Sequence, residues 1–311
     1  MGKLAFLFPG QGAQVVGMGK DFFDAYDLAK KRFAEADEAL GYSISKLCFE
    51  GPADQLQLTE HTQPAILTVS VIAAELLREE GIAPEIAAGH SLGEYSALVL
   101  AGVLSFQDAV ALVHKRGAYM QEAVPVGEGA MAAVIGLDDD TIVAVCAEAS
   151  AAGAVQAVNF NCPGQTVIAG TVKGVEKAVE LLQEKGAKKA VILPVSAPFH
   201  STLMEPAAKK LAAELDKVQL HDAAFPVVSN YTGGLQQTAA EIKANLVAQA
   251  DHPVRWIACV NTMRTFGADT HVECGPGKTL AGFNKRIDKA LTSLNVENVA
   301  SLQKTLDTLK K

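Results

Sequence analysis

The segment Gly89-His90-Ser91-Leu92-Gly93 has residue types and spacing suited to nucleophilic chemistry. This G-x-S-x-G pentapeptide follows a short apolar run, Ile86-Ala87-Ala88, and precedes a helix-like stretch from Tyr95 to Ala101. A strand, a tight turn and a helix in this order hold a serine on a sharp bend with its hydroxyl exposed. The glycines let two backbones approach closely, and the next amide can face a reacting carbonyl. The pattern predicts Ser91 as a nucleophile; a glycine-rich turn with an N-capping serine is the structural alternative.

A serine nucleophile requires a base, and the chain contains seven histidines. His200 lies in a predicted loop, residues 195–201, that connects two parts of the chain, and clefts between such parts often bind substrates. His271 is the alternative, because Asp269 lies two residues before it and the order serine, acid, histidine is that of α/β-hydrolases. At this point an esterase or thioesterase that uses Ser91, Asp269 and His271 therefore remains open.

The first loop, Gly10-Gln11-Gly12, follows a predicted strand and raises the possibility of dinucleotide binding. The fingerprint G-x-G-x-x-G is incomplete, because Val15 occupies the position of the third glycine. The loop also lacks the lysine of a P-loop. A loop of this kind can instead aim a backbone amide at an oxyanion.

Arg116 is unusual because it shares the apolar face of a predicted helix, residues 106–123, with Leu112, Val113 and Met120. A guanidinium is always charged and requires an anionic partner when it is buried. Two interpretations follow. Arg116 belongs either to an internal ion pair or to a bidentate site for a substrate carboxylate.

The composition is that of a packed globular protein, since 49% of the 311 residues are hydrophobic and 20% are charged. A net charge of -8, with no basic stripe, argues against binding of nucleic acid. The apolar run at residues 4–8 is too short for a signal peptide, and no stretch approaches membrane-spanning length. We therefore expect neither nucleic acid nor a membrane as a partner.

The five cysteines are an odd number at scattered positions, without a C-x-x-C pair or a zinc-ligand spacing. They predict reduced core thiols in a cytoplasmic protein and no metal site. Cys162, in a predicted loop, and Cys274, at a predicted strand end, are the two that are considered for chemistry.

Strands that alternate with helical patterns predict an α/β fold with a mainly parallel sheet. Between residues 125 and 196 the predicted order changes to βαββαβ, which is typical of a ferredoxin-like unit. We expect a large α/β-hydrolase-like domain, residues 1–124 and 197–311, with this small unit inserted at 125–196. The remaining predictions are helices at 18–40, 63–80, 203–215, 239–248, 254–266 and from 278, and strands at 4–8, 226–229 and 271–274.

Four segments, in order and spacing, closely resemble the malonyl-CoA:acyl carrier protein transacylases. The related acyltransferase domains of polyketide synthases are the family most easily confused with them. These segments are Phe8-Pro9-Gly10-Gln11-Gly12, Gly89-His90-Ser91-Leu92-Gly93-Glu94, Lys115-Arg116-Gly117 and Pro198-Phe199-His200. The resemblance extends over nearly the whole chain.

The resemblance implies a role for each matching residue. Ser91 would carry the malonyl group as an ester, and His200 would act as its base. The backbone amides of Gln11 and Leu92 would form the oxyanion hole. The backbone carbonyl of Gln249, instead of an acidic side chain, would orient the histidine.

The resemblance also implies how the acyl group is bound. Arg116 would hold the malonyl carboxylate, and Phe199 and Met120 would contact the acyl group. Gln63 and Asn161 match positions near the site without a firm role. The partners would be malonyl-CoA and acyl carrier protein, and no metal or redox cofactor is expected.

Overall fold

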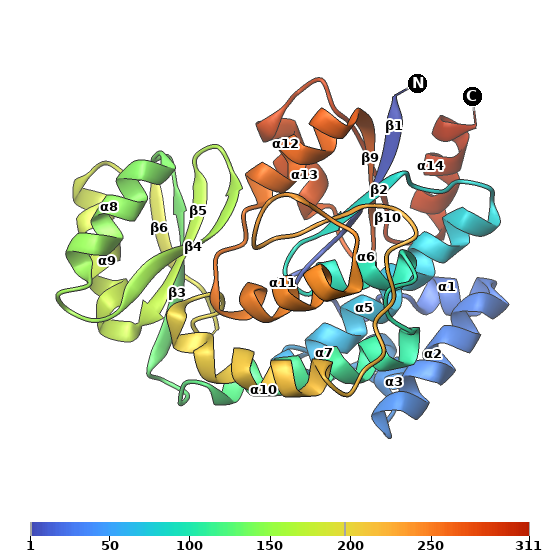
Figure 1. The fold of residues 1–311 in the computed structure, drawn as a ribbon, viewed down its shortest axis with the longest axis horizontal. Coiled ribbons are helices and arrows are strands. Elements are labelled where there is room, and N and C mark those ends of the chain that lie inside the picture. The colour runs from blue at the N-terminus through green and yellow to red at the C-terminus, as the bar shows by residue number, and fades with distance from the viewer. Residues whose placement is uncertain (1, 196, 311) are drawn as a thin grey trace.

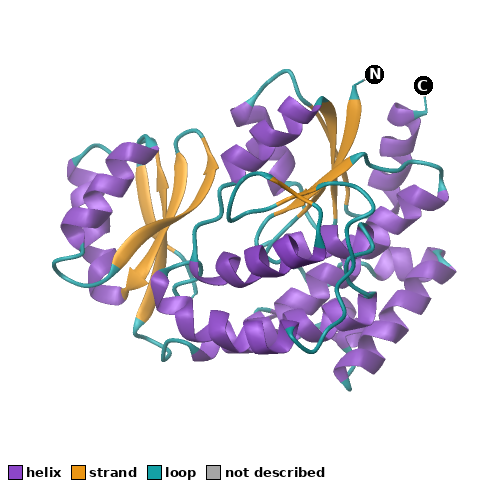
Figure 2. Ribbon diagram, viewed as in Figure 1, coloured by secondary structure: helices purple, strands orange, loops and turns teal. Residues whose placement is uncertain are grey.

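The computed structural model describes residues 2–195 and 197–310. The predicted boundary at residue 196 and the chain ends at 1 and 311 therefore lie outside the described residues. The described part contains one six-stranded and one four-stranded sheet, which Figure 1 and Figure 2 show apart from each other, each with helices packed against it. None of its helices is long and apolar enough to cross a membrane.

The six-stranded sheet has the order β10-β9-β1-β2-β7-β8. All neighbouring pairs are parallel except β7 and β8, which are antiparallel. The prediction of an α/β fold with a mainly parallel sheet is confirmed. The strands are β1 (Lys3–Phe8), β2 (Ile86–Gly89), β7 (Val227–Val228), β8 (Leu235–Gln236), β9 (Ala268–Cys274) and β10 (Thr292–Val296).

Both faces of this sheet are covered, as is typical of parallel sheets. Because side chains alternate along a strand, Phe6 and Phe8 of β1 join one hydrophobic core, whereas Ala5 and Leu7 join another on the opposite face. The first core contains side chains from α5 (Thr59–Glu79), α6 (Gly93–Leu100) and α7 (Phe106–Glu122). The second contains side chains from α12 (Trp256–Phe266) and α13 (Thr279–Ile287).

Further helices surround the first core and the connection to the small sheet (Figure 1). They are α1 (Lys20–Ala25), α2 (Asp27–Leu40), α3 (Ile44–Glu50), α4 (Ala53–Leu56), the 3-10 helix η1 (Thr202–Met204), α10 (Glu205–Leu215), α11 (Ala239–Asp251) and α14 (Val299–Leu309).

The four-stranded sheet is antiparallel and has the order β4-β5-β3-β6. Its elements follow the chain as β3 (Gly129–Ile135), α8 (Asp139–Ala149), β4 (Val155–Cys162), β5 (Gln165–Thr171), α9 (Val172–Glu184) and β6 (Lys189–Ile192). The two helices pack on one face of the sheet. On the other face, Met131, Val158 and Val167 pack against Phe199. The small sheet therefore lies against the loop that carries the candidate base.

Two local predictions were wrong, and some elements were not predicted. The helix expected at 18–40 is two helices, because Tyr26 has an extended backbone between them. The helix expected from 63 begins at Thr59, so Pro64 lies inside it. Because proline has no N–H, it cannot donate to the carbonyl of Glu60, four residues before it. That carbonyl accepts a hydrogen bond from His114 Nδ1 instead. Strand β10 and helix α14 were not predicted.

Candidate active site

Ser91 lies on a strained turn between β2 and α6. Its φ angle is 53°, in the left-handed region that non-glycine residues rarely adopt. The neighbouring glycines make the turn possible. A Cβ atom on Gly89 would lie 1.9 Å from the carbonyl of Gly93, and one on Gly93 would lie 2.1 Å from the carbonyl oxygen of Phe8. The predicted strand, turn and helix are therefore present, and only glycine fits at either position.

His200 contacts the hydroxyl of Ser91. The distance between Ser91 Oγ and His200 Nε2 is 2.7 Å, and His200 Nδ1 donates a hydrogen bond to the backbone carbonyl of Gln249 at 2.8 Å. Because the carbonyl can only accept, the proton lies on Nδ1 and leaves Nε2 free to accept from the serine. Burial and the nearby charge of Arg116 lower the pKa of His200 to about 3, so the ring is neutral near pH 7. This is the form that a general base requires.

Arg116 directs its guanidinium at the same serine. Its Nη2 donates to Ser91 Oγ at 3.0 Å and to Gln249 Oε1 at 3.0 Å, and its Nη1 donates to Gln63 Oε1 at 2.8 Å. The side chain is buried, and its Nε has no hydrogen-bond partner among the described residues. No carboxylate of residues 2–195 and 197–310 lies within ion-pair distance of Arg116. The internal ion pair that the sequence left open is therefore absent from the described contacts.

A cavity of about 410 Å³ opens over these groups. Part of its wall is formed by Met131 and Asn159 of the small sheet and by Leu193, the residue after β6. The predicted residues that line it are Gln11, Ser91, Leu92, Arg116, Met120, Phe199 and His200. Gln249 is not in the lining and reaches the site through its hydrogen bonds.

The backbone amides of Gln11 and Leu92 make no hydrogen bond to any described residue. The loop that carries Gln11 is packed closely against the serine turn, because a Cβ atom on Gly10 would lie 2.6 Å from the carbonyl oxygen of His90. His90 Nε2 in turn lies 2.8 Å from Asn161 Oδ1, in the small sheet. Two unpaired amides beside the serine hydroxyl are suited to binding a developing oxyanion.

His271 is not near the serine. It is buried on β9, where its Nε2 lies 3.3 Å from the carbonyl oxygen of Ala268 and its Nδ1 lies 3.1 Å from Asn284 Nδ2. Asp269 accepts a hydrogen bond from the backbone amide of Gly2. The alternative triad of Ser91, Asp269 and His271 is therefore wrong.

The two cysteines considered for chemistry are buried, and neither lines the cavity. Burial raises the pKa of the Cys162 thiol and, much further, that of the Cys274 thiol. Reactive cysteines have a lowered pKa, so these thiols have a structural role. Within residues 2–195 and 197–310, no three His, Cys, Asp or Glu side chains are grouped so that they could hold a metal ion.

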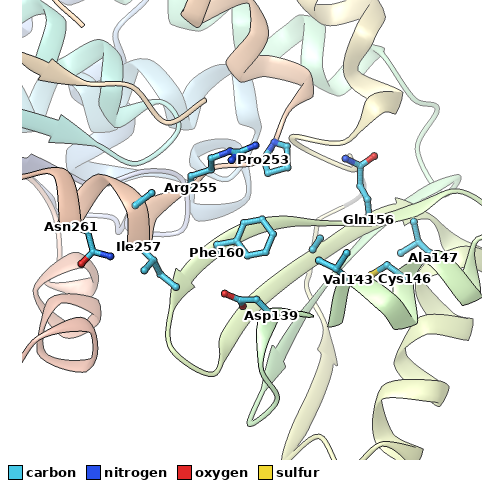
Figure 3. Close-up of a pocket in the computed structure, with 13 residues that line it drawn as sticks. Asp139, Val143, Cys146, Ala147, Gln156, Phe160, Pro253, Arg255, Ile257 and Asn261 are labelled. Atoms are coloured by element: carbon cyan, nitrogen blue, oxygen red, sulfur yellow. The ribbon is translucent and has the colours of Figure 1, made fainter. Parts of the chain in front are cut away.

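A second cavity, of about 670 Å³, lies between α8 and β4 of the small unit and the start of α12 (Figure 3). Asp139, Phe160 and Arg255 border it, but no serine or histidine does. It therefore lacks the pair of nucleophile and base that the smaller cavity contains.

Sequence reasoning missed two residues that support the site. Glu94 is completely buried and accepts three hydrogen bonds, one of them from the side chain of Gln249 at 2.6 Å. Asn230 Oδ1 accepts from the backbone amide of Ser91 at 2.6 Å. A signal for Glu94 existed, because it is an acidic residue at the start of an otherwise apolar helix. No local signal marks Asn230.

The cavity combines a strained serine, a neutral buried histidine and free backbone amides, which are the features that serine-dependent group-transfer sites use. A sequence model of the acyl transferase domain family matches residues 5–307, and the chain belongs to this family.

Full-length relatives agree with this assignment. The chain is 49% identical to the malonyl CoA-acyl carrier protein transacylase of Bacillus subtilis, over 100% of this chain and 98% of that protein. The crystal structure of acyl-carrier-protein S-malonyltransferase from Burkholderia pseudomallei has a TM-score of 0.96 and 52% identity, and covers 98% of this chain and 99% of that one. A malonyl-transacylase solved in complex with a type II PKS acyl-carrier protein has a TM-score of 0.96 and 45% identity, and covers 98% of this chain and 99% of that one.

Proposed function

We propose that the chain transfers a malonyl group from malonyl-CoA to the phosphopantetheine thiol of acyl carrier protein in fatty acid biosynthesis. It is an S-malonyltransferase that works by a ping-pong mechanism. The observation that carries this proposal is that His200 Nε2 lies 2.7 Å, and Arg116 Nη2 3.0 Å, from the same atom, Ser91 Oγ. The full-length similarity to named transacylases supports the substrates.

In the first half-reaction, His200 Nε2 takes the proton of Ser91 as Oγ attacks the thioester carbonyl of malonyl-CoA. The amides of Gln11 and Leu92 donate hydrogen bonds to the oxyanion that forms. When the tetrahedral intermediate collapses, the C–S bond breaks and His200 returns the proton to the sulfur of CoA. Ser91 then carries the malonyl ester.

In the second half-reaction, the thiol of acyl carrier protein takes the place of CoA. His200 removes the thiol proton, the sulfur attacks the ester, and the proton returns to Ser91 Oγ as the C–O bond breaks. The carbonyl of Gln249 holds the ring in one orientation throughout, since it accepts the hydrogen bond from Nδ1. The same base thus serves both nucleophiles.

Arg116 selects the acyl group by binding the free carboxylate of malonyl through both terminal nitrogens. This buried cation supports the proposal because its present partners are the neutral side-chain oxygens of Gln63 and Gln249 and the Ser91 hydroxyl. Phe199 and Met120 close the cavity around the acyl chain, where the ring of Phe199 would crowd a branch at the α-carbon.

We further infer an α/β-hydrolase-like catalytic domain, residues 1–124 and 197–311, with a ferredoxin-like unit at 125–196. The strand order β4-β5-β3-β6 and the two helices on one face support the second assignment. We expect a cytoplasmic location. Malonyl-CoA is a substrate, and the chemistry above needs no metal or redox cofactor.

Intact-protein mass spectrometry tests the proposal directly. After malonyl-CoA is mixed with the protein in the absence of a thiol acceptor, the mass should rise by one malonyl group, and peptide mapping should place it on Ser91. Ser91→Ala should stay unmodified, and added acyl carrier protein should remove the group from the wild type. An unmodified wild-type protein, or an adduct on a cysteine, would refute the assignment.

A further inference from the structure

Glu94 lies at the centre of the hydrogen-bond network behind the cavity. It is three residues after Ser91, in the first turn of α6, and is 0% exposed. Its carboxylate accepts hydrogen bonds from the backbone amide of Asn230 at 3.0 Å and from the Nε2 atoms of Gln236 and Gln249, both at 2.6 Å. Glu94 does not line the cavity, and none of its hydrogen bonds reaches the serine hydroxyl or the histidine.

The contact with Gln249 connects Glu94 to the reacting groups. The Nε2 atom of Gln249 also donates to the backbone carbonyl of Ser91 at 3.0 Å, and its Oε1 accepts from Arg116 Nη2. Its backbone carbonyl holds His200. One residue thus contacts the nucleophile, the base and the cation, and the carboxylate of Glu94 fixes the direction of its side-chain amide.

The contact with Asn230 connects Glu94 to the strained turn. Asn230 Oδ1 accepts from the amide of Ser91 at 2.6 Å, and its Nδ2 donates to the carbonyl of Gly89 at 2.7 Å. Both contacts belong to the bend that gives Ser91 its positive φ. Through one oxygen, Oε2, Glu94 therefore contacts both Asn230, which supports the turn, and Gln249, which supports the base.

We propose that Glu94 is a positioning residue for the transfer reaction: its buried carboxylate holds Gln249 and Asn230 so that Ser91, His200 and Arg116 keep their mutual geometry. This inference rests on the proposed function and deepens it. In the familiar catalytic triad a carboxylate contacts the histidine directly. Here the carboxylate acts through the amide of Gln249, and a peptide carbonyl contacts the ring.

The network requires the ionised form of Glu94. Three N–H donors point at its two oxygens, so the proton of a neutral carboxyl group would compete with one of them. The charged group that acts on it is Arg116 from α7. Glu94 in turn raises the pKa of Tyr95 in α6 and of Cys259 in α12. Burial raises the pKa of Glu94 to about 7, against the opposing effect of its donors and Arg116.

This pKa provides a readout that a purely structural role would not give. Burial and the charge of Arg116 lower the pKa of His200 to about 3, well below the pH at which we expect the acid limb of Glu94. Protonation of Glu94 as the pH falls through about 7 should therefore produce the acid limb of kcat/KM, which reports groups of the free enzyme.

The experiment compares Glu94→Gln with the wild type in malonyl transfer between pH 5 and 9. We expect kcat to fall about 10- to 100-fold, the scale of a hydrogen bond to a charged group, with a smaller change in KM. The acid limb near pH 7 should disappear. Glu273→Gln is the matched control, because Glu273 is also buried, has a pKa raised to about 7, and accepts two backbone hydrogen bonds in α13. It should keep the wild-type kcat and acid limb.

A double-mutant cycle with Gln249→Ala tests whether Glu94 acts through that side chain. This substitution removes the amide and keeps the backbone carbonyl that holds His200. If the two residues work as one unit, the double variant should be no slower than the slower single variant. Independent losses that multiply would overturn the proposal. So would wild-type kcat/KM for Gln249→Ala, even if Glu94→Gln fails to fold.

The failure of this inference differs from the failure of the proposed function. A wild-type protein that forms no malonyl ester on Ser91 refutes the function. A wild-type protein that forms the ester, together with a Glu94→Gln variant that has the wild-type kcat and pH profile, refutes only the positioning role.

Discussion

Replacement of Arg116 by alanine should change which acyl group the protein accepts. In the structure, Nη1 of the guanidinium donates to Gln63 Oε1 and Nη2 donates to Gln249 Oε1. A planar guanidinium can bind a carboxylate through the same two nitrogens. The substitution removes the attraction for the malonyl carboxylate. It also removes the penalty that an uncompensated buried cation imposes on a neutral acyl group.

The magnitude follows from the number of bonds. Two hydrogen bonds to a charged group, each contributing about 1.5–3 kcal/mol, sum to about 3–6 kcal/mol. At 1.36 kcal/mol per factor of ten, kcat/KM for malonyl-CoA should fall about 10²- to 10⁴-fold. The value for acetyl-CoA should fall much less or rise. The ratio of the two is the informative quantity, because Arg116 also donates to Ser91 Oγ and a change in serine reactivity would slow both substrates alike.

The assay measures kcat/KM for both thioesters from the release of CoA. Arg116→Lys is the control variant, because it keeps the charge and loses the paired N–H geometry; it should retain part of the preference for malonyl. Folding is checked by circular dichroism, since the change also leaves the side-chain oxygens of Gln63 and Gln249 without their donor. An unchanged ratio of malonyl to acetyl transfer in a folded Arg116→Ala protein would refute the carboxylate site.

Three further predictions concern residues around the same cavity. His200→Ala should reduce the rate of transfer about 10²-fold or more, whereas His271→Ala should lower the melting temperature and leave kcat/KM near wild type. A larger loss of transfer in His271→Ala than in His200→Ala would assign the base to His271. Phe199→Ser should raise kcat/KM for methylmalonyl-CoA relative to malonyl-CoA, and equal ratios in variant and wild type would show that the ring does not limit the α-carbon. Gly89→Ala should destabilise the protein by at least about 2 kcal/mol in chemical denaturation, because its Cβ would lie 1.9 Å from the Gly93 carbonyl; wild-type stability would contradict the packing of the turn.

Much of the fold was predictable because its signals are local. The β2 strand, the serine turn and α6 lie within fifteen consecutive positions, 86–100, and their periodicity and glycines determine the outcome. The order of elements in the small unit was visible for the same reason. The break at Tyr26 was not, because the apolar spacing continues through it and the backbone alone changes.

The supporting residues of the site could not be predicted in the same way. Glu94, Asn230, Gln236 and Gln249 meet because the fold brings together α6, the residues that follow β7, strand β8 and α11. Asn230 and Gln236 are ordinary polar residues in their own segments. Glu94 is marked only as an acidic residue at the start of an apolar helix, and Gln249 only by the family resemblance. The contacts of Glu94 with Asn230 and Gln249 join residues more than 130 positions apart. Such contacts depend on the order of the strands in the sheet, and no short sequence motif specifies that order.

The positive φ angles have a consequence for attempts to stabilise this protein. Ser91 and His200 are the non-glycine residues with positive φ among residues 2–195 and 197–310. Each such conformation costs about 1–2 kcal/mol, and glycine or asparagine adopts it more readily. A library of variants selected for heat resistance alone should therefore become enriched in glycine and asparagine at positions 91 and 200. Its most thermostable variants should be inactive. Screening for thermostability in this fold has to score turnover in the same round, because the backbone conformations that destabilise the protein are those of its reacting pair.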